Sequence, residues 1–390
     1  MNTLDASNLR KIGAEALRRG DAKAARDSFE RLVEADQADI NIWLALAGSC
    51  GRLGDLPAAH AAADKALALD AGNLRALIVK ADLLAHEGDT RAASSFYLNA
   101  VRLAPPPNQL TADLRGDIER ANAMCQRYAR EFEGFLMAKL GEHGFAPGAP
   151  TTRFAQSLEL LLGRRQIYLQ QPTYYYLPEL AQIQFFDRAK FPWIGKVEAA
   201  TADIRAELMQ VLEDGAAFKP YVQADPRRPR NPDNRMIGNP EWSAFYLWKD
   251  GEAVAENAAR CPKTLAALAD VPMPRVPKRS PSILFSLMRP GAHIPAHNGF
   301  VNTRLICHLP LVVPGQCHFR VGNEVREWVE GKAWVFDDTI EHEAWNRSNR
   351  TRVVLLFEIW RPELSDEERG LVHAMFEAID AHGGGPAWSI

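Results

Sequence analysis

A regular spacing in the first quarter of the chain constrains its fold more than any other feature. The dipeptide Gly-Asp occurs at residues 20–21, 54–55 and 88–89, at intervals of 54 − 20 = 34 and 88 − 54 = 34, and a pair of alanines follows each copy. Glycine ends a helix readily and aspartate caps the next one, so each copy predicts two antiparallel helices joined by a tight turn. A repeat of this length predicts an α-solenoid over residues 1–106.

The three copies resemble tetratricopeptide repeats over residues 6–105. Trp43 takes the aromatic position of the second copy, and Pro105 closes the third. The resemblance implies a concave surface that binds a peptide or another protein. A helical cap that only keeps the following domain in solution, or dimerises it, is the alternative.

We expect residues 107–150 to form a closing helix and a linker, and residues 151–390 to form a second domain. Apolar side chains at mostly three- and four-residue steps run from Leu114 to Phe135, which indicates a helix, and residues 141–150 are rich in glycine and proline. Further on we expect one amphipathic helix entered through Pro192 and a C-terminal helix capped at Ser365.

The stretch from Ser286 to Arg352 combines histidines with short strand-like segments. Five of the chain's ten histidines lie in it: His293, His297, His308, His318 and His342. Segments rich in Val, Ile, Leu, Phe and Trp alternate there with Pro-Gly and Gly-Asn turns, which indicates an antiparallel sheet or a small barrel. Histidine is the commonest metal ligand, so the pattern predicts a metal in the mouth of a barrel. The fold class is therefore α+β, with a barrel core at about residues 280–362.

The composition excludes several classes of protein. With 390 residues, 47% of them hydrophobic and 24% charged, the chain can bury the cores of two or three folded domains. A net charge of −3 does not indicate a nucleic-acid partner, and five scattered cysteines indicate neither a disulfide framework nor a close-spaced zinc site. The sequence shows no signal-like leader and no apolar run of membrane-spanning length, which predicts a cytoplasmic protein.

His297 and His342 form a candidate metal-binding pair. They are 342 − 297 = 45 residues apart, so they must lie on different strands and meet across the barrel. Oxygen-activating Fe(II) sites usually add a carboxylate, commonly two residues after the first histidine, but this chain has Gly299 there. We expect Asp337 and Asp338, five and four residues before His342, to support the site from a strand end or turn rather than to bind the metal.

Four segments carry a specific set of motifs. They are Pro295-Ala296-His297-Asn298-Gly299, Asn302-Thr303-Arg304-Leu305, residues 334–345 (WVFDDTIEHEAW), and Arg352 to Pro362. Together they resemble the aspartyl/asparaginyl β-hydroxylase family over residues 180–370. The family consists of Fe(II)- and 2-oxoglutarate-dependent oxygenases on a double-stranded β-helix, and in several members a helical repeat domain precedes it. These enzymes hold iron with two histidines and no protein carboxylate, which accounts for Gly299. Asn298 and Phe300 depart from the usual pattern around the first ligand.

The resemblance implies how the cofactor and co-substrates are held. His297 and His342 would bind Fe(II), and Arg352, helped by the hydroxyl of Ser286, would bind the distal carboxylate of 2-oxoglutarate. Arginine suits this role because its charge is permanent and its planar fork matches a carboxylate. O₂ would take the remaining position on the metal.

The resemblance also places His308 beside 2-oxoglutarate and Arg304 near the same pocket. The two residues share a strand face because 308 − 304 = 4 is an even step. Four arginines, Arg227, Arg228, Arg230 and Arg235, lie in a Pro- and Asn-rich loop. We interpret this loop as a solvated basic surface, with contact to an anionic substrate as the alternative.

The implied reaction is hydroxylation of a C–H bond, and the family's best-known target is the β-carbon of Asp or Asn residues in a polypeptide. The repeats favour a peptide or protein substrate, because such surfaces commonly hold extended chains. Three alternatives stay open. The chain could be an oxygenase of lipid acyl chains or small acids, a non-catalytic scaffold with a metal-binding barrel, or an Mn or Zn enzyme, such as an isomerase, on a cupin-like barrel.

Overall fold

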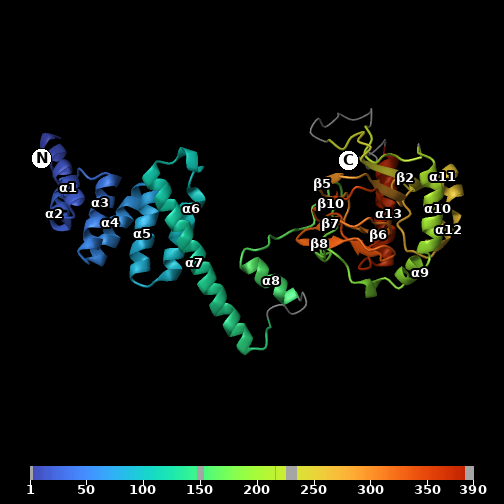
Figure 1. The fold of residues 1–390 in the computed structure, drawn as a ribbon, viewed down its shortest axis with the longest axis horizontal. Helices are drawn as coiled ribbons and strands as arrows, with labels where there is room; N and C mark the ends of the chain where they lie inside the picture. The colour runs from blue at the N-terminus through green and yellow to red at the C-terminus, as the bar shows by residue number, and fades with distance from the viewer. Residues whose placement is uncertain (1–2, 147–152, 216, 225–234, 383–390) are drawn as a thin grey trace. The chain divides into compact units, whose positions relative to one another are not determined.

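The computed structural model describes residues 3–146, 153–215, 217–224 and 235–382. Its contacts divide the chain into two compact units, Met1–Leu162 and Gly163–Ile390, and the division falls just after the predicted linker (Figure 1). Most of the predicted basic loop, including Arg227, Arg228 and Arg230, lies outside the described residues.

Six helices of the first unit form three pairs, as the repeats predict. They are α1 (Thr3–Arg19) with α2 (Ala22–Glu34), α3 (Ile40–Arg52) with α4 (Leu56–Leu69), and α5 (Leu74–His86) with α6 (Thr90–Leu103). Gly20, Gly54 and Gly88 make the turn within each pair at φ of +77°, +77° and +85°, a conformation that favours glycine. The side chain of each following aspartate accepts a hydrogen bond from the backbone N–H three residues later, at 2.9–3.2 Å. The predicted tetratricopeptide-like solenoid is confirmed.

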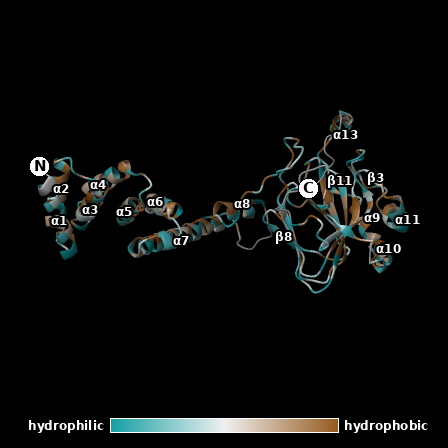
Figure 2. Ribbon diagram, turned by 90° about the horizontal axis from the view of Figure 1, so that it is seen from above, coloured by the Kyte–Doolittle hydropathy of each residue, from teal (hydrophilic) through white to brown (hydrophobic). Residues whose placement is uncertain are grey.

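A long helix, α7 (Ala112–Glu142), follows the short 3₁₀ turn η1 (Pro107–Gln109) and packs on the last pair. Its Ala121 and Ile118 share an apolar cluster with Tyr97 of α6. Farther along α7, Phe132 and Phe135 are exposed, and Figure 2 shows hydrophobic and hydrophilic residues alternating along the helix. Helix α8 (Arg153–Leu161) completes the unit.

Two antiparallel sheets form the core of the second unit. The larger has the strand order β1-β2-β4-β11-β6-β9, with β3 paired to β2, and the smaller has the order β5-β10-β7-β8. The strands of the larger sheet are β1 (Lys219–Pro220), β2 (Trp242–Lys249), β3 (Glu252–Ala253), β4 (Ile283–Met288), β6 (Arg304–Val312), β9 (Trp334–Phe336) and β11 (Arg352–Trp360). Those of the smaller sheet are β5 (His293–His297), β7 (Cys317–Val321), β8 (Glu324–Glu327) and β10 (His342–Asn346).

From β4 to β11 the chain passes repeatedly between the two sheets. Strands β4, β6, β9 and β11 belong to the larger sheet, and β5, β7, β8 and β10 belong to the smaller. This alternation is the topology of a jelly roll, or double-stranded β-helix, whose two sheets face each other. The predicted fold of the second domain is confirmed.

Four helices lie on one side of the barrel, beside the larger sheet (Figure 1). They are α9 (Ile194–Ala199), α10 (Thr201–Glu213), α11 (Ala255–Arg260) and α12 (Pro262–Ala267), and the 3₁₀ turn η2 (Arg188–Lys190) precedes them. The prediction of one continuous helix after Pro192 is wrong. Ala200 separates α9 from α10, and the Thr201 hydroxyl next to it donates a hydrogen bond to the Glu198 carbonyl at 2.6 Å. Helix α13 (Asp366–Ala381) begins with the predicted capping box of Ser365 and Glu368.

Both faces of the larger sheet are buried, and residue parity decides which face each side chain meets. The odd-numbered residues 305–311 of β6 and 353–359 of β11 share an apolar cluster with helices α9 and α10. The even-numbered residues therefore face the smaller sheet, where Ile306 and Val354 join a second cluster with Phe319 of β7. Polar residues at even positions of these strands meet inside the barrel.

Candidate active site

A cavity of about 400 Å³ lies inside the barrel, lined by the even-numbered faces of β4, β6 and β11 and by residues of the smaller sheet. All six residues predicted for the site line it: His297, His342, Arg352, Ser286, His308 and Arg304. The fold thus gathers side chains from strands distributed over much of the barrel sequence.

His297, at the end of β5, and His342, at the start of β10, lie side by side because the strands pair with these residues opposite each other. Their ring centroids are 4.0 Å apart. The Nδ1 atoms lie 2.8 Å from the carbonyl of Pro295 and 3.2 Å from that of Ile340. Since a carbonyl only accepts, each Nδ1 donates, and Nε2 of each neutral ring keeps a free lone pair. Burial lowers the pKa of both rings, that of His342 well below its ordinary value, so they stay neutral.

Residue 299 has no room for a third ligand. A Cβ at Gly299 would lie 2.1 Å from Oδ2 of Asp338, so the Asp338 carboxylate occupies the space that a side chain would need. Among the described residues, no group of three or more His, Cys, Asp or Glu side chains is arranged to hold a metal. The Oδ1 atom of Asp338 is buried and has no hydrogen-bond partner in the described part of the chain. A buried acceptor without a donor indicates a place for a hydrogen-bonding ligand or a water.

Arg352 is a buried cation that pairs with no carboxylate among the described residues. It is 1% exposed, its guanidinium lies 4.4 Å from the ring centroid of Trp328, and Nη1 donates to the Ser286 carbonyl at 3.2 Å. Its Nε has no partner among the described residues, and burial lowers its pKa to about 9. The other buried arginines of the described residues each pair with a carboxylate: Arg279 with Asp380, Arg304 with Asp338, and Arg361 with Asp337. Arg352 is therefore positioned for an anionic ligand.

Ser286 and His308 line the same cavity. Oγ of Ser286 accepts a hydrogen bond from Nε1 of Trp242 at 3.2 Å, so its own proton can be donated elsewhere. His308 is buried against aromatic rings, with the centroid of Phe336 at 4.8 Å, and its Nδ1 has no partner among the described residues. Burial, together with the charge of Arg352, lowers the pKa of His308 well below its ordinary value.

Arg304 uses its charge within the protein. Nη1 donates to Oδ2 of Asp338 at 2.9 Å, and Nε pairs with Oε1 of Glu358 at 2.9 Å. Burial opposes the charged form, but the two carboxylates outweigh it and raise the pKa of Arg304. Glu358 is fixed in turn by the Ser280 hydroxyl at 2.8 Å and the Ser282 N–H at 3.0 Å. Arg304 lies in the predicted pocket, where it holds two carboxylates in place.

Comparison with known proteins agrees with this geometry. Residues 198–362 match the family model described as Aspartyl/Asparaginyl beta-hydroxylase. All of the matched residues lie within the second unit. The chain is 36% identical over 181 residues to the ornithine lipid ester-linked acyl 2-hydroxylase of Rhizobium tropici, covering 45% of this chain and 60% of that protein. It is 38% identical over 139 residues to human aspartyl/asparaginyl beta-hydroxylase, covering 35% of this chain and 18% of that protein. It thus spans less than two thirds of the length of either relative.

Two solved structures also resemble part of the chain. They are PcrH from Pseudomonas aeruginosa, at 21% identity and a TM-score of 0.30 over 33% of this chain and 93% of that one, and the TPR2B domain of yeast Sti1 in its pHsp70 complex, at 21% identity and a TM-score of 0.28 over 31% and 98%. The repeat assignment rests on the helix pairs themselves. None of the described helices combines the length and the apolar character needed to cross a membrane.

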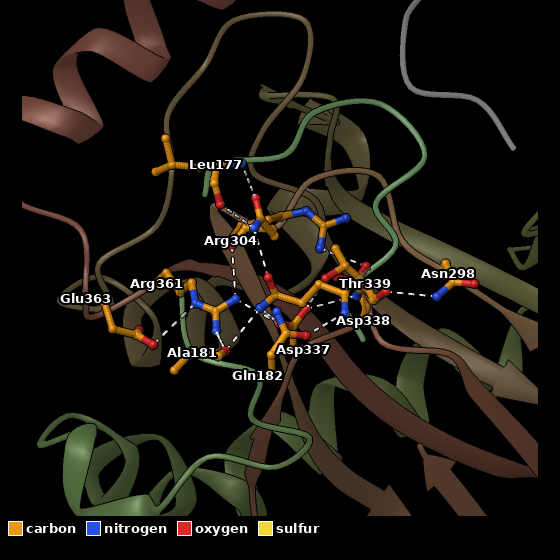
Figure 3. Close-up of polar contacts among 12 residues, drawn as sticks. Leu177, Ala181, Gln182, Asn298, Arg304, Asp337, Asp338, Thr339, Arg361 and Glu363 are labelled. Carbon is orange, nitrogen blue, oxygen red and sulfur yellow. Dashed lines mark hydrogen bonds and ion pairs between the residues drawn. The ribbon is translucent and has the colours of Figure 1, made fainter. Parts of the chain in front are cut away.

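A buried polar network around Asp337 lies next to Asp338, which lines the cavity (Figure 3). Asp337 accepts hydrogen bonds from Arg361 and Gln170, both at 2.7 Å, and from the Thr339 hydroxyl at 2.5 Å. The Asn298 amide donates to the Thr339 carbonyl at 2.8 Å, which ties the loop after the first histidine to the segment before the second. No pattern in the sequence predicts a role for Arg361 or Gln170. Their partner Asp337 lies 24 and 167 residues away, so no local pattern marks them.

The charged residues that flank the second histidine point away from the cavity. Glu341 and Glu343 pair with Arg320 at 2.8 and 2.7 Å. His293 is exposed, stacks on Trp345 with ring centroids 5.6 Å apart, and lies 2.8 Å from Glu343. Strand alternation turns Glu343 away from His342, whereas His293 lies an even step from His297 and is turned outward by the register shift between β5 and β10.

Proposed function

We propose that the chain is an Fe(II)- and 2-oxoglutarate-dependent dioxygenase that hydroxylates the β-carbon of an Asp or Asn residue in a peptide or protein. The observation that carries the proposal is that one cavity contains two adjacent neutral histidines and a buried arginine for which the described part of the chain offers no carboxylate. A ferrous ion would bind to the two histidines, and a dicarboxylate would pair with the arginine. The match of residues 198–362 to the hydroxylase family model supports the reaction class.

The donor set fits a ferrous ion. His297 and His342 offer two imidazole Nε2 lone pairs, and the lack of a third protein ligand among the described residues would leave positions for a bidentate keto acid, for O₂ and for water. The free Oδ1 of Asp338 would accept a hydrogen bond from a ligand in one of those positions. When bound with 2-oxoglutarate, the iron would supply the oxidising chemistry that replaces a C–H hydrogen with a hydroxyl group.

The chain's own residues would bind and orient the co-substrate. Arg352 would pair with the distal carboxylate of 2-oxoglutarate, and this pairing would offset the cost of burying its charge. Ser286 would donate its free proton to the same carboxylate. His308 adds a neutral hydrogen-bonding group beside it, and the rings of Trp328 and Phe336 would exclude water from the reaction.

The named relatives act on two substrate classes, the aspartyl or asparaginyl residue and the acyl chain of an ornithine lipid. We favour a peptide or protein because repeats of this type commonly bind extended chains. An acyl chain is the second candidate, because Ile294, Ile306 and Leu356 give the cavity an aliphatic wall.

The test is anaerobic titration of the Fe(II)-loaded protein with 2-oxoglutarate, followed by the visible charge-transfer band of the chelate. We expect the band in the native protein and its loss in His342→Ala and Arg352→Ala, because the first removes a metal ligand and the second the carboxylate partner. Glu256→Gln, at an exposed position of α11, is the matched control and should keep the band. Iron binding without the band would refute the 2-oxoglutarate assignment and favour another metal chemistry. A protein that binds neither would be a scaffold.

A further inference from the structure

The inner face of β11 gives the cavity two ends of opposite character. Arg352 and Glu358 both point into it, and they are 358 − 352 = 6 residues apart, which is about 20 Å along a strand. Leu356 lies between them on the same face. A dicarboxylate at Arg352 therefore leaves the Glu358 end for the second substrate.

The Glu358 end has more carboxylates than cations among the residues that the structure describes. Its ionisable residues and their partners are the cations Lys249, Arg279 and Arg304 and the carboxylates Asp250, Asp338, Glu358 and Asp380, a sum of 3 − 4 = −1. Arg279 is held by Asp380, and Lys249 is exposed at the rim, with its amine over the ring of Tyr246. The buried cation nearest the histidines, Arg304, already contacts two carboxylates through Nε and Nη1.

A carboxylate entering this end would meet two fixed carboxylates, Asp338 and Glu358, and a guanidinium that they already neutralise. Carboxylates that contact one another in a buried site repel each other strongly. A carboxamide differs because it carries no charge and has two N–H donors. The buried Oδ1 of Asp338, an acceptor without a donor among the described residues, matches such a group.

We propose that this site selects an asparagine-type carboxamide over an aspartate-type carboxylate, with Glu358 as a specificity-determining residue. The proposal rests on the hydroxylase function above and narrows its substrate class. Glu358 acts together with Asp338 by keeping the charge around Arg304 negative, so that a substrate carboxylate meets no net positive charge there.

The test uses three small probes: N-acetyl-asparagine N-methylamide, N-acetyl-aspartate N-methylamide and methyl hexanoate. Each is titrated anaerobically into the protein loaded with Fe(II) and 2-oxoglutarate, and binding is followed by the change in the chelate band and by ligand-observed NMR. We expect the asparagine probe to bind at least about tenfold more tightly than the aspartate probe, as one unscreened charge repulsion in a buried site predicts. In Glu358→Gln the aspartate probe should gain affinity until the ratio falls close to one. Glu256→Gln on the exposed face of α11 should leave the ratio unchanged.

Three results would overturn the proposal, and they are distinguishable. Equal or tighter binding of the aspartate probe to the native protein refutes the charge argument while leaving the hydroxylase function intact. Binding of methyl hexanoate in place of both amino-acid probes identifies an acyl-chain site. Failure of the chelate band to form refutes the proposed function and this inference with it. The melting temperature of Glu358→Gln, measured alongside, shows whether its altered ratio comes from a folded protein.

Discussion

Replacing Arg352 with methionine should stabilise the protein without ligand and abolish its response to 2-oxoglutarate. The side chain is buried, and no carboxylate among the described residues pairs with it. Because arginine stays protonated at any pH that the fold tolerates, its lowered pKa expresses a free-energy cost rather than a titration. That cost applies in full at every pH below the folded-state pKa of about 9, which includes neutral pH.

The magnitude follows from the same value. A pKa of about 9 lies about 3.5 pH units below that of an ordinary arginine, and at about 1.4 kcal/mol per unit the unpaired charge costs about 5 kcal/mol. The contact with Trp328 returns about 2 kcal/mol of this. Methionine keeps most of the apolar stem, so Arg352→Met should gain about 1–3 kcal/mol in free energy of unfolding. For a unit of this size that raises the melting temperature by about 2–4 °C per kcal/mol.

The assay is thermal unfolding with and without 2-oxoglutarate, in the presence of Mn(II) to prevent turnover. The native protein should gain about 2.7 kcal/mol at a 2-oxoglutarate concentration of 100 times the dissociation constant, and Arg352→Met should gain nothing. Arg361→Met is the matched control, because its guanidinium is equally buried but pairs with Asp337 at 2.7 Å. Removing it leaves a buried carboxylate without its cation and should cost about 3–5 kcal/mol. If Arg352→Met lowers stability as much as Arg361→Met does, the description of Arg352 as an unsatisfied cation is wrong.

Three further experiments test other parts of the structure. Gly299→Asp should lower metal content and stability rather than complete a three-ligand site, because its Cβ would lie 2.1 Å from Asp338. Adding Asp338→Gly vacates that space and should restore metal content and stability. Metal analysis of the single and the double variant tests this expectation. Asp89→Ala removes the cap of α6 and should cost the first unit about 1 kcal/mol in a denaturant titration while leaving the melting of the second unit unchanged; a shift in the second unit would contradict their division. Ser286→Ala should weaken 2-oxoglutarate binding about 3–10-fold in the chelate titration, the loss of one hydrogen bond, and an unchanged affinity would show that its proton goes elsewhere.

Sequence patterns predicted the parts of this structure that depend on local periodicity. The 34-residue spacing defined the helix pairs, because glycine at positive φ and an aspartate cap are requirements of a single turn. The even step from 304 to 308 placed Arg304 and His308 on one strand face, and both side chains do line the cavity. The meeting of His297 and His342 followed from their separation along the chain.

Contacts between distant segments could not be predicted in this way. The pairing of Arg304 with both Asp338 and Glu358 joins three strand ends, and the burial of Arg361 on Asp337 depends on how the barrel closes. The break between α9 and α10 depends on one side-chain hydrogen bond to the backbone, which competes with helix continuation. Each of these features depends on tertiary contacts, which a periodic pattern in one sequence does not specify.

The role of Gly299 was predicted only in part, because its sequence position was recognised and its contact with Asp338 was not. The sequence lacks the usual carboxylate at this position, and in the structure the carboxylate of Asp338 lies in the space where that side chain would begin. The negative charge near the histidines is therefore supplied by Asp338, which precedes the second histidine by four residues and is held by Arg304, instead of being fixed on the loop of the first ligand. A carboxylate held in this way faces its neighbours through one free oxygen and can serve a ligand's N–H or a water without binding the metal. The absence of a side chain at Gly299 thus leaves coordination positions open at the metal and leaves room for Asp338, one of the carboxylates from which we infer that the substrate group is uncharged.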